Sequence, residues 1–165
     1  MKIFGIIGWK NSGKTGLVER LVADLTARGL VVSTVKHAHH NFDVDQPGRD
    51  SYRHRHAGAQ EVLLSSNNRW CLMHELRGAA EPTLAELLAH LSPCDLVLVE
   101  GFKYDPIDKI ECHRSVTGNG LMAPNDPRIL AIASDTPLDG QAVPVMDLSD
   151  TEAVSAFILN HTGLG

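Results

Sequence analysis

The first 35 residues alternate between apolar runs and one amphipathic stretch. Residues 3–7 are apolar at every position but Gly5, which is typical of a strand covered on both faces of a parallel sheet. After a glycine-rich break at 8–13, apolar residues recur at helical spacing until Gly29, which predicts an amphipathic helix. The β-branched run at 30–35 predicts a second strand. Strand, helix and strand in this order form one right-handed βαβ unit.

The remaining patterns continue this alternation. Strands are predicted over 61–65, 69–73, 95–100, 109–114 and 129–133, and helices over 48–58, over 84–91 and after a capping segment at 149–152. The polar segment 37–47 is expected to be a loop. The pattern predicts a three-layer α/β fold with a mostly parallel sheet and helices on both faces. No linker or repeat interrupts it, so we expect one domain over residues 1–165.

Composition narrows the class of protein. The 165 residues carry a formal net charge of −5, which argues against a nucleic-acid-binding surface. Cys71, Cys94 and Cys112 are far apart and form no CxxC pair, so we expect free thiols and a reducing compartment, the cytoplasm. The apolar run near the N-terminus is too short to span a bilayer, so no membrane association is expected.

The break after the first strand carries the strongest chemical signal. Residues 8–15 match the P-loop pattern G-x-x-x-x-G-K-T, between the strand and the helix that this motif requires. Backbone amides are expected to surround a phosphate, Lys14 to reach the β- and γ-phosphates, and the Thr15 hydroxyl to bind Mg²⁺. Lys14 would also stabilise charge during any hydrolysis. Nucleotide contacts are predicted at Gly8, Lys10, Asn11, Ser12, Gly13, Lys14, Thr15 and Gly16. The expected fold is therefore the P-loop NTPase (Rossmann-like) fold.

Two further strands end in residues suited to a nucleotide site. Glu100 closes the apolar strand at 95–100, at the edge where open α/β sheets bind ligands, and is expected to hold Mg²⁺ directly or through water. Ser134 and Asp135 follow the strand at 129–133. The Asp135 carboxylate could accept hydrogen bonds from guanine N1–H and N2–H₂. Adenine lacks these donors and would leave the carboxylate unpaired, at a cost of about 1–3 kcal/mol.

Five segments, taken together and in order, resemble the MobB family, the molybdopterin-guanine dinucleotide biosynthesis proteins B. They are 8–15, 35–37, 48–53 with 57–59, 99–103 and 109–111. The resemblance covers nearly the whole chain. It implies a homodimer that binds GTP with Mg²⁺ and hydrolyses it slowly at most. It also implies an accessory role beside a MobA-type guanylyltransferase, the partner that attaches GMP to molybdopterin.

Further contacts are expected outside the P-loop, at the ligand edge of the sheet after the second strand and from arginines that can bind a phosphate with two N–H groups. Phosphate or pterin contacts are expected from Lys36, His37, Arg49, Arg53 and Lys103. Asp50, which lies beside Arg49 in a family-like segment, is a candidate for a second metal contact.

Two other functions fit parts of the sequence. A small-molecule kinase would need arginines over the phosphates, and only the cluster at 49–55 could supply them. A metallochaperone GTPase of the nickel-insertion kind would use His37, His39 and His40, although the spacing completes no zinc pattern. The alternating strands at 61–73 could pair across a dimer.

Overall fold

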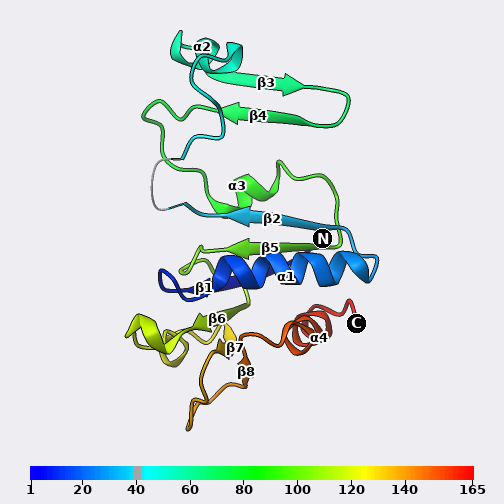
Figure 1. Cartoon of the computed structure of the whole chain (residues 1–165), viewed down its shortest axis with the longest axis vertical. Helices are drawn as coiled ribbons and strands as arrows, with labels where there is room; N and C mark the ends of the chain where they lie inside the picture. Colours follow the sequence, from blue (N-terminus) through cyan, green and yellow to red (C-terminus); the bar gives the residue numbers. More distant parts are fainter. Residues whose placement is uncertain (39–41) are drawn as a thin grey trace. The chain divides into compact units, whose positions relative to one another are not determined.

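The structure, a computed structural model, describes residues 1–38 and 42–165. The chain divides into two units, each with its own internal contacts: unit 1 comprises Met1–His37 and Leu84–Gly165, and unit 2 comprises Ala38–Thr83. Figure 1 shows the elements of both units. The expectation of one domain over residues 1–165 stays a prediction.

Unit 1 is built on a six-stranded sheet in which all neighbouring strands are parallel. The strand order is β2-β5-β1-β6-β7-β8. The strands are β1 (Lys2–Gly8), β2 (Val32–Lys36), β5 (Leu96–Glu100), β6 (Lys109–His113), β7 (Ile129–Ser134) and β8 (Val145–Asp147). The predicted parallel α/β fold is confirmed.

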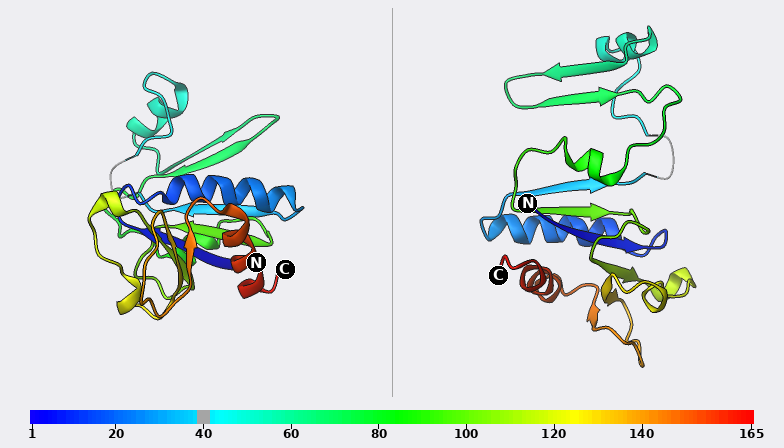
Figure 2. Two further views of the ribbon diagram at one scale, coloured as in Figure 1. Left: turned by 60° about the horizontal axis from the view of Figure 1, so that its bottom comes forward. Right: turned by 180° about the vertical axis from the view of Figure 1, so that it is seen from behind.

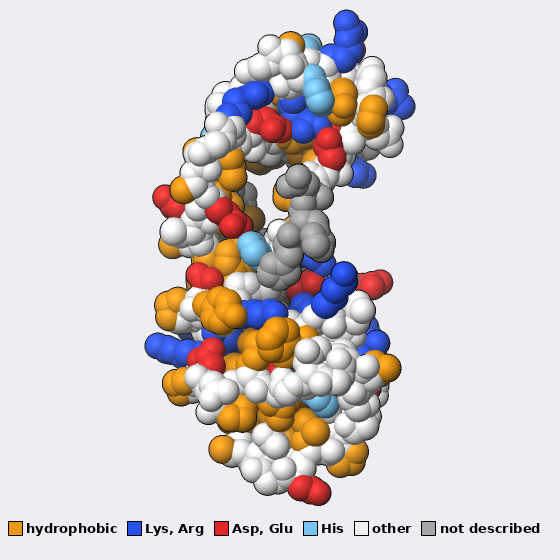
Figure 3. Space-filling view, turned by 90° about the vertical axis from the view of Figure 1, so that its left-hand side faces the viewer, with side chains coloured by type: hydrophobic (Ala, Val, Ile, Leu, Met, Phe, Trp, Pro, Cys, Tyr) orange, Lys and Arg blue, Asp and Glu red, His pale blue; other side chains and the backbone are white. Residues whose placement is uncertain are grey.

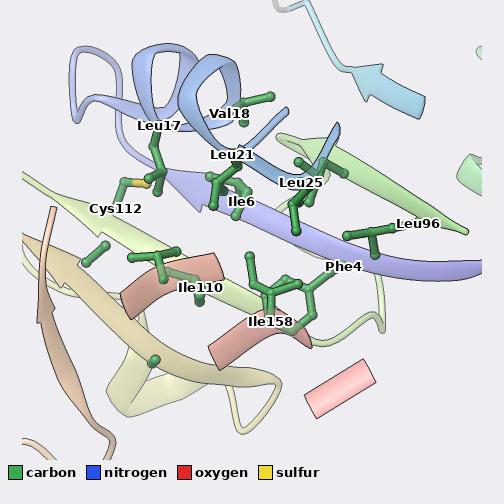
Figure 4. Packing of buried hydrophobic residues seen from close by; sticks show 14 of the residues in the cluster. Phe4, Ile6, Leu17, Val18, Leu21, Leu25, Leu96, Ile110, Cys112 and Ile158 are labelled. Carbon is green, nitrogen blue, oxygen red and sulfur yellow. The ribbon is translucent and has the colours of Figure 1, made fainter. Parts of the chain in front are cut away.

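Helices cover both faces of this sheet (Figures 1 and 2). Helices α1 (Lys14–Ala27) and α4 (Thr151–Thr162) pack on one face, and the short α3 (Leu84–Leu88) packs on the other. The stripe predicted on α1 is buried at Leu17, Val18, Leu21 and Leu25, and its remaining member, Val22, is half-buried. Leu17, Leu21 and Leu25 point toward the sheet in Figure 4. Phe4 and Ile6 meet this stripe from β1, and both are fully buried. This packing fixes the start of α1 over the end of β1.

The strand order changes sides at β1, which makes β1 the topological switch point of the sheet. From β1 the chain crosses to β2 on one side, with β5 inserted between them, and later adds β6 on the other side. In open α/β sheets, ligands bind at the carboxyl ends of the strands at such a point. The glycine-rich segment 8–13 lies there.

Two charged side chains lie buried within β6. The Lys109 ammonium donates to the carbonyls of Lys103 and Asp105 and to the Asp126 carboxylate, at 2.8–3.1 Å. Glu111 accepts from the amides of Met122 and Ala123 at 2.8–2.9 Å. The two side chains therefore fasten the segments after β5 and after β6 to the sheet. The second segment contains the 3₁₀ helices η1 (Ser115–Thr117) and η2 (Ala123–Asn125).

Unit 2 contains helix α2 (Asp50–His56) and an antiparallel hairpin of β3 (Glu61–Ser65) and β4 (Trp70–His74). The Arg55 guanidinium organises this unit, with ion pairs to Asp43, Asp45 and Glu75 at 2.8–3.3 Å. The helix predicted at 48–58 and the two predicted strands are confirmed, with ends shifted by up to two residues.

Strand β8 was not anticipated from the sequence. It has three residues, follows Pro144, and is only partly buried. Three positions are too few to show the alternation of apolar and polar residues that predicts a strand.

Leu21→Ala is expected to lower the free energy of unfolding by about 2–5 kcal/mol, because it leaves a cavity where α1 meets the sheet. Urea denaturation measures the loss. Val116→Ala removes methyl groups from a residue that is 84% exposed and should change stability by less than about 0.5 kcal/mol. Equal losses for the two variants would contradict the proposed core.

Candidate nucleotide-binding site

The segment between β1 and α1 has the backbone geometry of an anion cradle. Its φ angles are positive at Gly8 (148°), Asn11 (65°) and Gly13 (92°). Alternation between left- and right-handed residues turns successive N–H groups toward one point and forms a concave nest. The helix α1 begins directly after Gly13, so its first amides, which have no partner within the helix, face the same point.

The glycines of the cradle are required by contact as well as by conformation. A Cβ on Gly13 would lie 2.9 Å from Leu148 Cδ2 and 3.0 Å from Arg114 Nε. A Cβ on Gly8 would collide with Ser12 Oγ and the Cys112 carbonyl. The Ser12 side chain is thus buried under the loop, so Ser12 contributes to the cradle through its position in the backbone.

The Lys14 ammonium folds back over the loop. It donates to the Trp9 carbonyl at 2.7 Å and closes the ring of main-chain amides. Partial burial lowers the pKa of Lys14 below its ordinary value, and the nearby cations Lys103 and Lys36 act in the same direction, whereas Glu100 opposes them. An incoming phosphate would offer this ammonium a charged acceptor in place of a carbonyl.

Thr15, Glu100 and Lys36 meet beside the cradle. Thr15 Oγ1 donates to Glu100 Oε1 at 2.9 Å, and Lys36 Nζ lies 2.9 Å from the same carboxylate oxygen and 3.1 Å from the threonine oxygen. Glu100 is buried, with 7% of its surface exposed. A hydroxyl and a carboxylate held against one cation form the kind of oxygen pair that supports Mg²⁺ beside nucleotide phosphates. The residues predicted for the metal from the P-loop and from β5 are thus adjacent.

Trp9 ties the cradle to its neighbours. Its indole N–H donates to the Gly120 carbonyl at 2.8 Å, and Lys103 Nζ lies 4.4 Å from the centre of its ring. Lys103 is therefore beside the cradle, as a phosphate contact would require. Figure 3 views the carboxyl ends of β2 and β5, where lysine and arginine side chains (blue) lie next to acidic ones (red).

A cavity of about 440 Å³ opens at the cradle and is lined by Asn11, Gly13, Lys14, Thr15, Gly16 and Arg114. Arg114 was not singled out from the sequence. Arg114 directly follows β6, which pairs with β1. Because the carboxyl ends of parallel strands lie at one edge of the sheet, its place after a predicted strand could have marked it as a candidate.

A second cavity, of about 380 Å³, lies after β7 and β8 and is lined in part by Ser134, Asp135 and Asp147. Asp135 Oδ1 accepts from the Ser115 amide at 2.9 Å, which holds the carboxylate in place. Ser134 Oγ lies 3.1 Å from His113 Nδ1 and accepts from the Thr136 amide at 3.2 Å. Ser134 therefore shapes the turn, and Asp135 places a carboxylate on the wall of this cavity.

The other predicted contacts are distributed over both units. The His37 amide donates to the Glu100 carbonyl at 2.9 Å, and its ring lies 5.1 Å from that of Phe102. Lys10 is exposed on the cradle. Arg49, Asp50 and Arg53 belong to unit 2, where Asp50 and Arg53 lie 3.9 Å apart on the surface. Their predicted contacts stay predictions.

The histidine-based alternative gains no support. His39 and His40 lie outside the described residues. Within residues 1–38 and 42–165, no group of three or more histidine, cysteine or acidic side chains is arranged to hold a metal. A site of the Thr15 and Glu100 kind, with few protein ligands, depends on phosphate oxygens to complete the coordination.

The parallel sheet, the cradle after β1 and the acidic end of β5 define a P-loop NTPase-like nucleotide-binding protein. A profile of the family described as "Molybdopterin guanine dinucleotide synthesis protein B" matches residues 3–135. The chain belongs to this family, MobB.

Relatives over the full length agree with this assignment. The chain is 38% identical over 162 residues to the molybdopterin-guanine dinucleotide biosynthesis adapter protein of Escherichia coli, covering 95% of this chain and 91% of that protein. It is 39% identical to the adapter protein of Haemophilus influenzae, with 96% and 88% covered. The crystal structure of a MobB homologue from Bacillus stearothermophilus is 27% identical and covers both chains fully, with a TM-score of 0.77. None of these relatives favours a kinase or a nickel metallochaperone.

The part of the chain that the structure describes contains no helix long and apolar enough to cross a bilayer.

Alkylation should distinguish the cysteines. Burial raises the pKa of Cys112 to about 12, with Glu100 and Glu111 adding to the effect and Lys14 opposing it. Iodoacetamide at pH 8 should therefore modify the exposed Cys71 and leave Cys112 unreacted, as read by mass spectrometry. The denatured chain, in which all three thiols should react, is the control. Rapid modification of Cys112 in the native protein would contradict its position under the cradle.

Proposed function

We propose that this protein binds GTP with Mg²⁺ and acts as an accessory protein in the assembly of the guanine dinucleotide form of molybdenum cofactor. The cradle at 8–15 carries the proposal, because its convergent amides and the Lys14 ammonium suit a polyphosphate and few other ligands. The relatives named as adapter proteins of molybdopterin-guanine dinucleotide biosynthesis support the pathway.

The preference for guanine rests on Asp135. Its carboxylate lines the second cavity and is held by the Ser115 amide, so it can accept from guanine N1–H and N2–H₂. Adenine would leave the same carboxylate without donors.

Magnesium would be held by Thr15 and Glu100, which are already in contact, together with phosphate oxygens. The metal would neutralise charge on the β- and γ-phosphates. Lys14 would add electrostatic stabilisation as the charge shifts during hydrolysis. The described residues that line the phosphate cavity include no carboxylate or imidazole to activate water, so hydrolysis is proposed to be slow.

A slow nucleotide cycle suits an adapter better than a metabolic enzyme. The proposed partner is a MobA-type guanylyltransferase in the cytoplasm, which performs the nucleotidyl transfer itself. Contacts to the phosphates or to a pterin are proposed for His37, Arg49, Arg53 and Lys103, and a further metal contact for Asp50. Lys36, expected from the sequence to be such a contact, lies against Glu100 and Thr15 instead.

Replacing Lys14 tests the proposal. Lys14→Ala removes a charge-assisted hydrogen bond to phosphate and should weaken GTP binding by about 10- to 150-fold. Labelled GTP, competed by ATP, GDP and molybdopterin with and without Mg²⁺, gives the affinity and the base preference in one series.

Lys2→Ala is the matched control, because Lys2 lies at the opposite end of β1 from the cradle. It should bind GTP like the wild type. Unchanged affinity in Lys14→Ala would refute the cradle. Competition by ATP as strong as that by unlabelled GTP would refute the guanine preference.

We also propose that the protein is a homodimer in which the hairpin of unit 2 takes part. One face of the hairpin carries Leu63, Trp70 and Leu72, which are 61%, 64% and 42% exposed. Exposed apolar side chains gathered on one surface are typical of a protein interface.

Trp70→Asp places a charge in this apolar face and should weaken the dimer by at least about tenfold, as read by sedimentation velocity over a range of concentrations. Tyr104→Asp is the control, since Tyr104 is 94% exposed in unit 1. A dimer that survives Trp70→Asp but not Tyr104→Asp would place the interface on unit 1.

A further inference from the structure

The Lys36 ammonium lies beside the two oxygens that are proposed to hold a divalent cation. It lies 2.9 Å from Glu100 Oε1 and 3.1 Å from Thr15 Oγ1, the two oxygens assigned to magnesium above. Lys36 and Glu100 face each other in the register of β2 and β5, so the sheet holds their backbones in fixed relation. The contact is therefore built into the strand pairing.

The Lys36 ammonium and a metal ion would draw on the same two oxygens, Thr15 Oγ1 and Glu100 Oε1. The threonine hydroxyl donates its proton to Glu100 and accepts from Lys36 through a lone pair. A metal ligand must offer a lone pair to the ion. Magnesium and the Lys36 ammonium thus compete for the same oxygens, and their positive charges repel each other.

The two side chains of this ion pair differ in their exposure to solvent. The Glu100 side chain is 9% exposed, whereas that of Lys36 is 53% exposed. A buried carboxylate is costly without a cation, so Glu100 requires one at all times. A long lysine side chain with access to solvent can leave when another cation arrives. The Lys14 ammonium donates to the Trp9 carbonyl, and no hydrogen bond joins it to Glu100 among the contacts of the described residues.

We propose that Lys36 is a resident cation at the metal position, which supports nucleotide binding in the absence of Mg²⁺ and is displaced when Mg²⁺ enters with the nucleotide. This inference rests on the proposed nucleotide-binding function and specifies how that site responds to magnesium. The protein keeps Glu100 neutralised in either state, so added Mg²⁺ raises nucleotide affinity by less than it would in a protein without this lysine.

The test measures the affinity for labelled GTP as Mg²⁺ is raised from zero, in EDTA, to saturation. Lys36→Met should weaken Mg²⁺-free binding by about tenfold and should lower the Mg²⁺ concentration at half-effect by about tenfold, because the competing charge is gone. Lys36→Arg keeps a cation and should retain most of the Mg²⁺-free affinity. Lys2→Met, the same chemical change at the far end of β1, should match the wild type.

Two results would overturn the inference. Lys36→Met could leave both quantities unchanged. It could also lower affinity by the same factor at every Mg²⁺ concentration, which would make Lys36 an ordinary phosphate contact.

Thermal unfolding without nucleotide gives an independent measurement. Lys36→Met should lower the Tm, since it leaves Glu100 buried without a cation, and adding Glu100→Gln should recover most of the loss. If Glu100→Gln restores the Tm but the protein binds no GTP under any condition, the ion pair is supported and the nucleotide-binding function is refuted. A Tm insensitive to both substitutions would refute the ion pair itself.

Discussion

The burial of the Glu100 carboxylate at the end of β5 is the constraint on which the site depends. Strand β5 lies between β1 and β2, so the residue at its end is enclosed by the cradle on one side and by Lys36 on the other. A buried negative charge has to be matched, and Thr15 and Lys36 match it. The start of α1, the end of β2 and the end of β5 are thereby drawn to one point.

The sequence was most informative where the residues of a functional element are consecutive along the chain. The cradle, its flanking strand and helix, and the acidic end of β5 are each contained in one short segment, and their local patterns suffice to predict them. The parallel sheet followed from fully apolar strands such as 96–99. The hairpin of unit 2 was indicated by alternation and a turn at 66–68.

What the sequence did not reveal depends on strand order. Arg114 reaches the phosphate cavity because β6 pairs with β1, and Lys36 meets Thr15 because β5, not β1, lies beside β2. No local period encodes such neighbours. The buried Lys109 and Glu111 likewise resemble surface positions of an alternating strand, and only the segments that fold over them satisfy their charges.

The bonds of Trp9 have a thermodynamic consequence. The indole is fastened to the Gly120 carbonyl and lies under the Lys103 ammonium, while Glu111 anchors the segment that carries Gly120. The cradle is thus rigid before any anion arrives, and little conformational freedom remains to be lost on association. Preorganisation of this kind directs more of the contact energy into affinity and favours rapid association over slow induced fit.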